Sequence, residues 1–170
     1  MTNYPDVADH LDEQFEGSGG TIRIPGQNGE LVIFHSVLLI DRLVEREELA
    51  LGLDIIVDEP SRCVRYRNRP IVPTDLVYLR RFLNAAMTEL HPEASVQAFH
   101  SESAGLVISV VGSSNLSVQL EVGVTEYLDD PDPDIDRIRL DVNRAALDEP
   151  VDIADSMIDV FVPINERGRE

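Results

Sequence analysis

The stretch from Pro73 to Leu90 constrains the fold of this chain more than any other. Its apolar residues recur at helical spacing, namely Leu76, Leu79, Leu83, Ala86, Met87 and Leu90, with Phe82 beside them. This pattern predicts one long amphipathic helix whose apolar stripe must be covered by other elements. We expect Thr74 to be its N-cap, because a threonine hydroxyl can accept a hydrogen bond from a free amide of the first turn. Pro92 should end the helix, since proline pushes the preceding residue out of the α region.

Strand patterns precede this helix. Residues 21–24 and 31–39 are apolar runs separated by a turn sequence at 26–29, which predicts an opening hairpin. Residues 53–57 have the composition of a buried strand. Between them, residues 41–49 mix aspartate, arginine and glutamate, and the pattern allows either a short helix or an irregular connection.

Strand patterns also follow the helix, at residues 95–99, 106–111, 116–124 and 137–142. The last two alternate apolar and polar residues, which is typical of strands with one buried face. Antiparallel strands with one long helix on a face form the α+β architecture. The sequence therefore predicts an α+β fold, with a meander-like antiparallel sheet, one long amphipathic helix packed on it and short terminal helices.

The domain organisation follows from composition. We expect an N-terminal extension over residues 1–20, with a short helix and a glycine-rich joint, then one α+β domain over 21–164 and a frayed tail over 165–170. The polar, acidic N-terminus argues against a signal peptide, and no apolar run is long enough for a transmembrane helix. The single cysteine, Cys63, rules out an internal disulfide, and its strand-like surroundings predict a small buried side chain. These features favour a cytoplasmic location.

Charge is the most pronounced feature of the composition. The formal net charge is -18, and all 14 basic residues are arginine. Such a field repels nucleic acid and anionic lipid and attracts basic proteins, so we expect neither nucleic acid nor membrane as a partner. An arginine-only, aspartate-rich composition also suits proteins of GC-rich or salt-loving organisms. The acidity is therefore either functional or a surface adaptation.

The loop from Asp129 to Asp136 is the most distinctive local feature. Its alternate aspartates have the spacing of a calcium loop, but Ile135 stands where the tight turn needs glycine, and two prolines stiffen the segment. We therefore predict no metal, and interpret the loop as either a rigid acidic finger that enters a cationic cleft or a solvated connection. A stiff loop loses little entropy on binding.

A second acidic stripe is expected in the short helix after Pro150, opposite an apolar side. The candidate partner-binding residues are Asp129, Asp130, Asp132, Asp134 and Asp136 in the loop and Asp152, Asp155 and Asp159 in the C-terminal helix.

The segment 62–69 is the one basic patch. One interpretation is a binding site for an anion or a carboxylate. The other is a strand face whose arginines pair with acidic neighbours.

Catalytic signatures are sparse. The four histidines are scattered without metal-ligand spacing, and no glycine-rich phosphate loop follows a strand. We predict that the protein is not an enzyme and has no catalytic residues, cofactor or metal.

The helix and its surroundings carry a family resemblance. A D-L-x-x-L-x-x-F-L helix, followed by a run of antiparallel strands, is formed here by Asp75, Leu76, Leu79, Phe82 and Leu83. This arrangement resembles small bacterial immunity proteins of polymorphic toxin systems, of the WapI-associated kind. The resemblance implies a cytoplasmic, non-enzymatic antagonist in a toxin-antitoxin pair, which neutralises its cognate toxin by occluding the active site.

Two hypotheses follow. The first is an acidic binding protein, an immunity-type inhibitor of a basic toxin or enzyme, whose on-rate gains from electrostatic steering. The alternative is a structural or accessory domain of a larger assembly or homo-oligomer whose acidity is surface adaptation. The oligomeric state stays open at this point.

Overall fold

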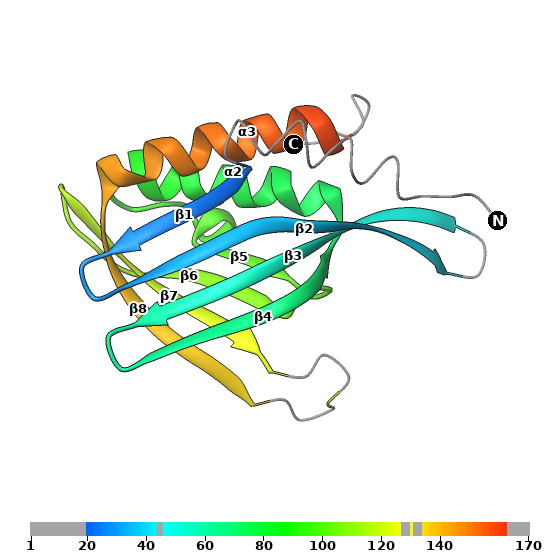
Figure 1. Cartoon of the computed structure of the whole chain (residues 1–170). Helices are drawn as coiled ribbons and strands as arrows, with labels where there is room; N and C mark the ends of the chain where they lie inside the picture. Colours follow the sequence, from blue (N-terminus) through cyan, green and yellow to red (C-terminus); the bar gives the residue numbers. More distant parts are fainter. Residues whose placement is uncertain (1–19, 44–45, 127–129, 131–133, 163–170) are drawn as a thin grey trace.

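Two four-stranded sheets and two helices make up the molecule (Figure 1). The computed structural model describes residues 20–43, 46–126, 130 and 134–162, with the backbone alone over 35–51 and at 53 and 68. The predicted N-terminal helix and C-terminal tail lie outside these residues. The strands are β1 (Thr21–Gly26), β2 (Gly29–Leu43), β3 (Arg46–Glu59), β4 (Arg62–Ile71), β5 (Ala98–Ser101), β6 (Leu106–Ser113), β7 (Ser117–Thr125) and β8 (Ile135–Asn143). The helices are α2 (Pro73–Thr88) and α3 (Asp148–Phe161), with short 3-10 turns η1 (Ala94–Val96) and η2 (Arg144–Leu147).

Both sheets are antiparallel and have meander order, β1-β2-β3-β4 and β5-β6-β7-β8. The predicted α+β class is confirmed, although the strands form two sheets where one was expected. Four strands and a helix follow one another twice along the chain, a regularity of element order without a matching repeat in the sequence.

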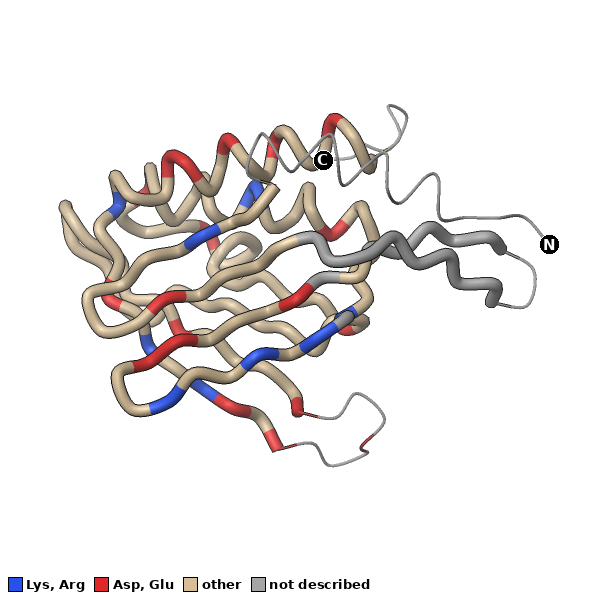
Figure 2. The backbone as a smooth tube through the Cα atoms, viewed as in Figure 1, with Lys and Arg blue, Asp and Glu red and all other residues tan. Residues whose placement is uncertain are grey.

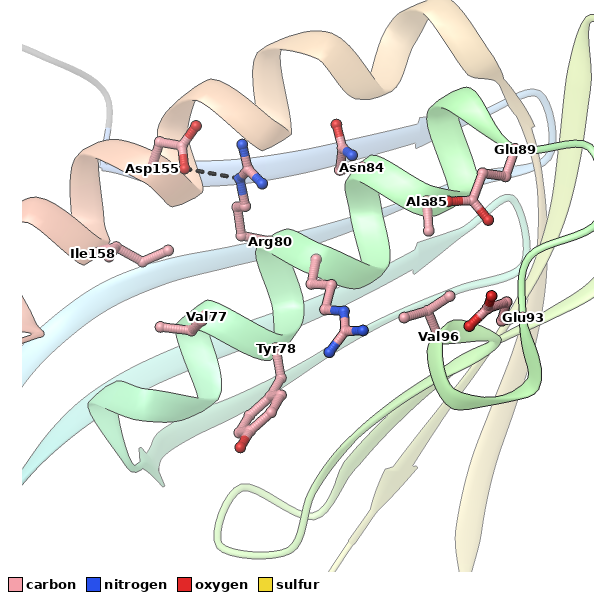
Figure 3. Close-up of a pocket in the computed structure, with 11 residues that line it drawn as sticks. Val77, Tyr78, Arg80, Asn84, Ala85, Glu89, Glu93, Val96, Asp155 and Ile158 are labelled. Carbon is pink, nitrogen blue, oxygen red and sulfur yellow. Dashed lines mark hydrogen bonds and ion pairs between the residues drawn. The ribbon is translucent and has the colours of Figure 1, made fainter. Parts of the chain in front are cut away.

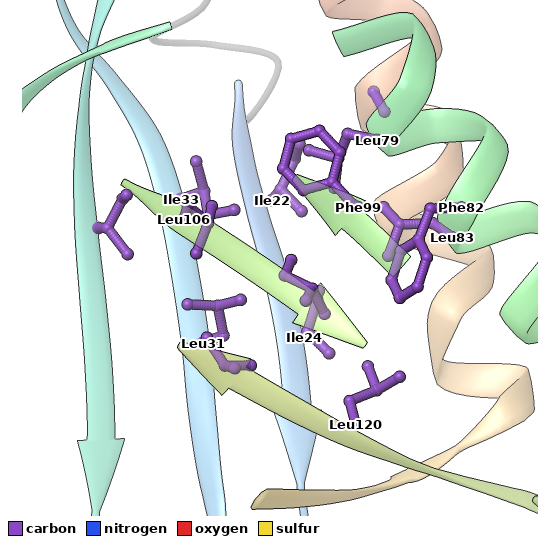
Figure 4. Packing of buried hydrophobic residues seen from close by; sticks show 14 of the residues in the cluster. Ile22, Ile24, Leu31, Ile33, Leu79, Phe82, Leu83, Phe99, Leu106 and Leu120 are labelled. Carbon is purple, nitrogen blue, oxygen red and sulfur yellow. The ribbon is translucent and has the colours of Figure 1, made fainter. Parts of the chain in front are cut away.

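The two sheets and α2 share one apolar core (Figure 4). Ile22, Ile24, Leu31 and Ile33 of the first sheet lie near Leu106 and Leu120 of the second and near Leu79, Phe82 and Leu83 of α2. The predicted alternation holds in β7 and β8, where every second residue from Val118 to Val124 and from Ile138 to Val142 is buried. Each sheet therefore hides one face, and the helices close one side of the space between them (Figure 1).

The apolar stripe of α2 is buried as predicted, but both ends of the helix differ from expectation. Val72 is the N-cap and makes no side-chain cap bond, so the predicted role of Thr74 is wrong. Pro73 occupies the first turn instead, where its fixed φ suits the helix and its missing N–H costs nothing. The helix ends at Thr88, and Leu90 lies beyond it with 41% of its surface exposed.

Residues 41–43 and 46–49 form neither a helix nor an irregular connection. They belong to β2 and β3, in which Asp41 pairs with Glu48 and Leu43 with Arg46. The charges that obscured the pattern lie near the end of the hairpin, and the apolar run just before them carries the strand onward.

The C-terminal helix is longer than predicted. It begins at Asp148, directly after η2, because a proline at position 150 falls in the first turn, where helices tolerate it. Val151, Ala154, Met157 and Phe161 are buried, while Asp148 and its neighbour Glu149 place negative charge at the positive end of the helix dipole.

Arg144 ties the second sheet to the end of α2. Its guanidinium donates to the carbonyl oxygens of Ala86 at 2.5 Å and Glu89 at 2.8 Å, and its Nε donates to that of Ser114 at 2.7 Å. Only 8% of the residue is exposed. The last turn of α2 contains no basic residue of its own. Arg144 therefore supplies the positive charge that the negative end of the helix dipole favours.

The hairpin turn between β1 and β2 packs against the second half of β8. The Asn28 side chain donates to the carbonyl of Arg139 at 2.5 Å and accepts from the amide of Asp141 at 3.0 Å. The Gln27 amide donates to the carbonyl of Asp141 at 2.9 Å. These bonds occupy part of the outer edge of β8, which would otherwise offer unpaired groups to another strand.

We predict that Arg144→Met lowers the free energy of unfolding by about 2–3 kcal/mol, because three carbonyl oxygens, of which that of Ala86 is buried, lose a charged donor. Urea denaturation would measure the change. Arg139→Met is the matched control, since Arg139 is exposed and its ion pair with Glu121 should contribute less than about 1 kcal/mol. Equal losses of stability in the two variants would contradict the role of Arg144 in holding the end of α2.

Candidate functional site

A groove of about 580 Å³ runs along the outer face of α2, between α3 and the η1 turn (Figure 3). Val77, Tyr78, Arg81 and Asn84 of α2 line it. These positions face outward because residues 76, 79 and 83 of the same helix are buried in the core. A second hollow of about 300 Å³ shares Tyr78, Arg81 and Val96 with the groove and continues it toward β5.

The charges along this groove are unevenly balanced. Arg80 Nε donates to Asp155 Oδ1 of α3 at 2.9 Å, so these two charges compensate each other (Figure 3). Arg81 is exposed and forms no hydrogen bond or ion pair within the described residues. Glu89 and Glu93 belong to the lining as well. Tyr78 has 55% of its surface exposed. An aromatic ring beside an uncompensated cation is a surface suited to binding.

The second hollow brings Asp75 and His100 together. Burial raises the pKa of the Asp75 carboxyl, and a hydrogen bond from the Ser101 hydroxyl and the nearby His100 partly oppose that shift. Ser101 is fully buried, and its hydroxyl oxygen also accepts from the Ala104 amide at 3.3 Å. We therefore interpret the hollow as part of a binding surface. The sequence did not indicate Asp75 as the carboxylate near His100, because no local pattern joins residues 25 positions apart.

The acidic residues of α3 lie along one helix (Figure 2). Asp152 is exposed and Asp155 half-buried in its ion pair with Arg80, and Asp159 is exposed near the end of the helix. Asp148 and Glu149 extend the series at the start. Asp148, Glu149 and Asp152 form no ion pair with the described residues, so their charge is directed to solvent or a partner.

The predicted acidic loop is only partly described. Asp129 and Asp132 lie outside the described residues, while Asp130 and Asp134 are exposed. Asp136 has an internal role that the sequence did not suggest. It accepts from Tyr66 Oη at 2.5 Å and from Arg62 Nη1 at 3.0 Å, which joins the start of β8 to β4. The Tyr66 hydrogen bond and the Arg62 charge hold the pKa of the Asp136 carboxyl below its usual range, against the effect of its burial.

The arginines of β4 pair mostly with neighbours, as one of the two interpretations held. Arg62 contacts Asp136 and, at 3.9 Å, Glu59. Arg65 binds Asp54 of the adjacent strand at 2.5 Å.

Arg69 is nearly buried, with 7% of its surface exposed, and its Nη2 donates to the carbonyl of Glu126 at 2.6 Å. Cys63 on the same strand is exposed, so its predicted burial is wrong. It follows Arg62 at the start of an edge strand, where the hairpin turn leaves both faces open.

Comparison with known proteins gives no family: no protein-family model matches the chain, and no curated protein matches its sequence. Among the described residues, no three histidine, cysteine or acidic side chains are grouped as metal ligands would be. None of the described helices combines the length and apolar character needed to span a membrane.

Asp136 should make stability depend on pH. Its pKa is lowered in the folded state, so its contribution is present above the unfolded pKa and is lost as pH falls through the folded pKa. We predict that Asp136→Asn costs about 1–2 kcal/mol at neutral pH, from a charged hydrogen bond at a partly exposed site, and that the difference shrinks in acid.

Urea midpoints at neutral and acid pH would measure this effect. The control is Asp134→Asn, two residues earlier on the chain and exposed. A loss that is the same at both pH values would contradict the role given to the Asp136 charge.

Proposed function

We propose that this protein is a non-enzymatic binding protein whose partner is a basic protein. The observation that supports this proposal is the way its charges are distributed. Described arginines are largely used inside the molecule, whereas the carboxylates at the start of α3 face outward without cationic partners. Such a surface steers a cationic partner toward the molecule.

The internal use of arginine is consistent across the fold. On the sheets, Arg23 pairs with Glu30 at 3.3 Å, and Arg137 and Arg139 both pair with Glu121, at 2.9 and 3.3 Å. Glu121 consequently has a pKa below its usual range, chiefly through the hydrogen bond from Arg137. Paired acids of this kind contribute little to a binding field at short range. At the start of α3, by contrast, Asp148, Glu149 and Asp152 are exposed carboxylates without an arginine partner among the described residues.

The groove beside α3 supports a specific contact in addition to steering. It is concave, it contains the exposed ring of Tyr78 and the unpaired Arg81, and α3 forms one of its walls. Aromatic residues and arginines in concave sites are the side chains that most often dominate binding energy. In the proposal, the acidic α3 face guides the encounter and the groove fixes the final complex.

In its finer form, the proposal is an immunity-type antagonist. An acidic domain that occludes the active site of a basic toxin or basic enzyme needs rapid association and a stable contact surface, and steering and a groove meet those needs. Support for this form comes from the charge distribution and from the resemblance of the α2 motif to small immunity proteins. Identification of the partner would show which toxin or enzyme is bound and what chemistry its active site performs.

Neutralising exposed acids on α3 should slow association with the partner captured by the full chain. We predict that the pair Glu149→Gln and Asp152→Asn lowers the association rate several-fold at low salt, and that the difference disappears as salt screens the field. Stopped-flow or surface-based kinetics would measure the rates.

The control pair, Asp58→Asn and Asp141→Asn, removes the same charge from exposed sites on the two sheets. If both pairs slow association equally, net charge alone accounts for the effect and α3 is not the contact face.

The groove should act on the dissociation rate instead. We predict that Tyr78→Ala weakens the complex by about 2 kcal/mol, mainly through faster dissociation that changes little with salt. Leu116→Ala is the control, because Leu116 is 80% exposed on the turn between β6 and β7, away from the groove. Unchanged dissociation in Tyr78→Ala would remove the groove from the interface.

A further inference from the structure

The hairpin of β2 and β3 extends beyond the sheet that contains it. β1 accompanies β2 no farther than Phe34, which pairs with Thr21, and β4 accompanies β3 no farther than Leu51, which pairs with Ile71. The two strands continue as each other's partner from Leu38–Leu51 to Leu43–Arg46. Residues 38–43 and 46–51 therefore form a two-stranded arm that projects from the body (Figure 1).

The register of the arm gathers apolar residues on one face. Cross-strand partners lie on the same face of a ladder, and positions two apart along a strand share it. Leu38–Leu51 and Ile40–Leu49 are successive pairs on one face. The next pair on that face, Arg42–Glu47, has opposite charges and lies close to the tip. An isolated two-stranded hairpin is marginally stable in water.

The outer edge of β2 in the arm also lacks a strand partner among the described residues. The run Val37–Ile40 at this edge contains no charged residue and no proline. Natural edge strands are protected by lysine, proline, bulges or short length, and a long apolar edge without these features is a site of strand association. The bulge between His35 and Val37 precedes this run and leaves the edge beyond it regular.

We propose that the arm is a dimerisation element and that its occupant is the arm of a second copy of this chain. The β2 edges of two copies pair antiparallel about a twofold axis that passes through the Leu39 pair, perpendicular to the sheet. This register places Leu39 opposite its own copy and Leu38 opposite Ile40, so each central pair is apolar and the contact is self-complementary. The proposal concerns assembly and goes beyond the binding function above.

A second copy fits this surface better than the basic partner does. Homodimer interfaces are the more apolar class, and the base of the arm offers apolar residues in place of the carboxylates that a cationic protein seeks. Charged residues lie toward the tip, at Asp41 and beyond, so the central contact brings no like charges together.

Salt separates the two proposals. Each copy has a formal net charge of -18, so long-range repulsion opposes dimerisation at low salt and is screened at higher salt. We expect the dimer to become tighter as salt rises, whereas the complex with a basic partner becomes weaker. Failure of one proposal therefore leaves the other open to its own test.

Sedimentation equilibrium of the full chain at low and moderate salt tests the dimer. We expect a dimer that strengthens with salt, and Ile40→Lys should raise its dissociation constant about tenfold or more, because an edge lysine opposes strand pairing. Leu116→Lys is the control, with the same change at a leucine that is 80% exposed elsewhere, and should dimerise like the parent chain.

A second variant removes the arm and keeps the sheet. Val37 and Gly52 are register partners, so an Asn-Gly turn can join them directly in place of residues 38–51. This variant should retain the circular dichroism and cooperative unfolding of the parent and be monomeric. A dimer that persists in it would overturn the proposal, because another surface would then hold the copies together.

A monomeric full chain in moderate salt would also overturn the proposal. Removal of residues 1–19 adds a separate check on the occupant. If dimers form only after that removal, the N-terminal segment of the same chain covers the arm in the full protein, and the second-copy assignment is wrong.

Discussion

The apolar core that two sheets share with α2 determines where every other surface of this molecule lies. Each sheet has one apolar face, and an antiparallel sheet of this kind must cover that face with another layer. Here the two sheets and the stripe of α2 cover one another. The opposite side of α2 is therefore directed outward, and it becomes the floor of the groove. Arg144 fixes this arrangement at the helix end, because its buried charge meets the carbonyls that α2 leaves free.

The distribution of negative charge over the surface is the second feature on which the proposed function depends. Composition alone cannot distinguish a binding surface from adaptation to a saline cell, since both require excess carboxylates. The fold provides a distinction. Acids such as Glu121 and Asp54 on the sheets have arginine partners, whereas Asp148, Glu149 and Asp152 follow one another at the start of α3 without such partners among the described residues. A local series of unpaired carboxylates is what a steering surface needs.

Local patterns predicted local structure well. The stripe of α2 and the alternation in β7 and β8 were evident from the sequence, because one helix face or one strand face suffices to generate them. The hairpin over residues 41–49 was missed because charges near its end broke the alternation. The division into two sheets could not be predicted either, since it depends on pairing between strands and not on any one strand.

The candidate site, like the fold, was predicted only where a local pattern determines it. Asp152, Asp155 and Asp159 were foreseen as one stripe because helical spacing is local. The hollow of Asp75 and His100 and the bond from Tyr66 to Asp136 join residues far apart in the chain, so only the folded arrangement reveals them. Asp136 is the instructive case: a residue chosen for its place in an acidic loop has a partner on another sheet, and its charge is used for stability.

The most direct test of the central claim is capture of the partner. The full chain would be immobilised and exposed to an extract of the cells in which it occurs, at low and then moderate salt, and the retained proteins would be identified by mass spectrometry. The account predicts one basic protein that remains bound at moderate salt because groove contacts outlast the screened field. Retention of nothing specific, or of copies of this chain alone, would contradict it and leave the acidity as surface adaptation.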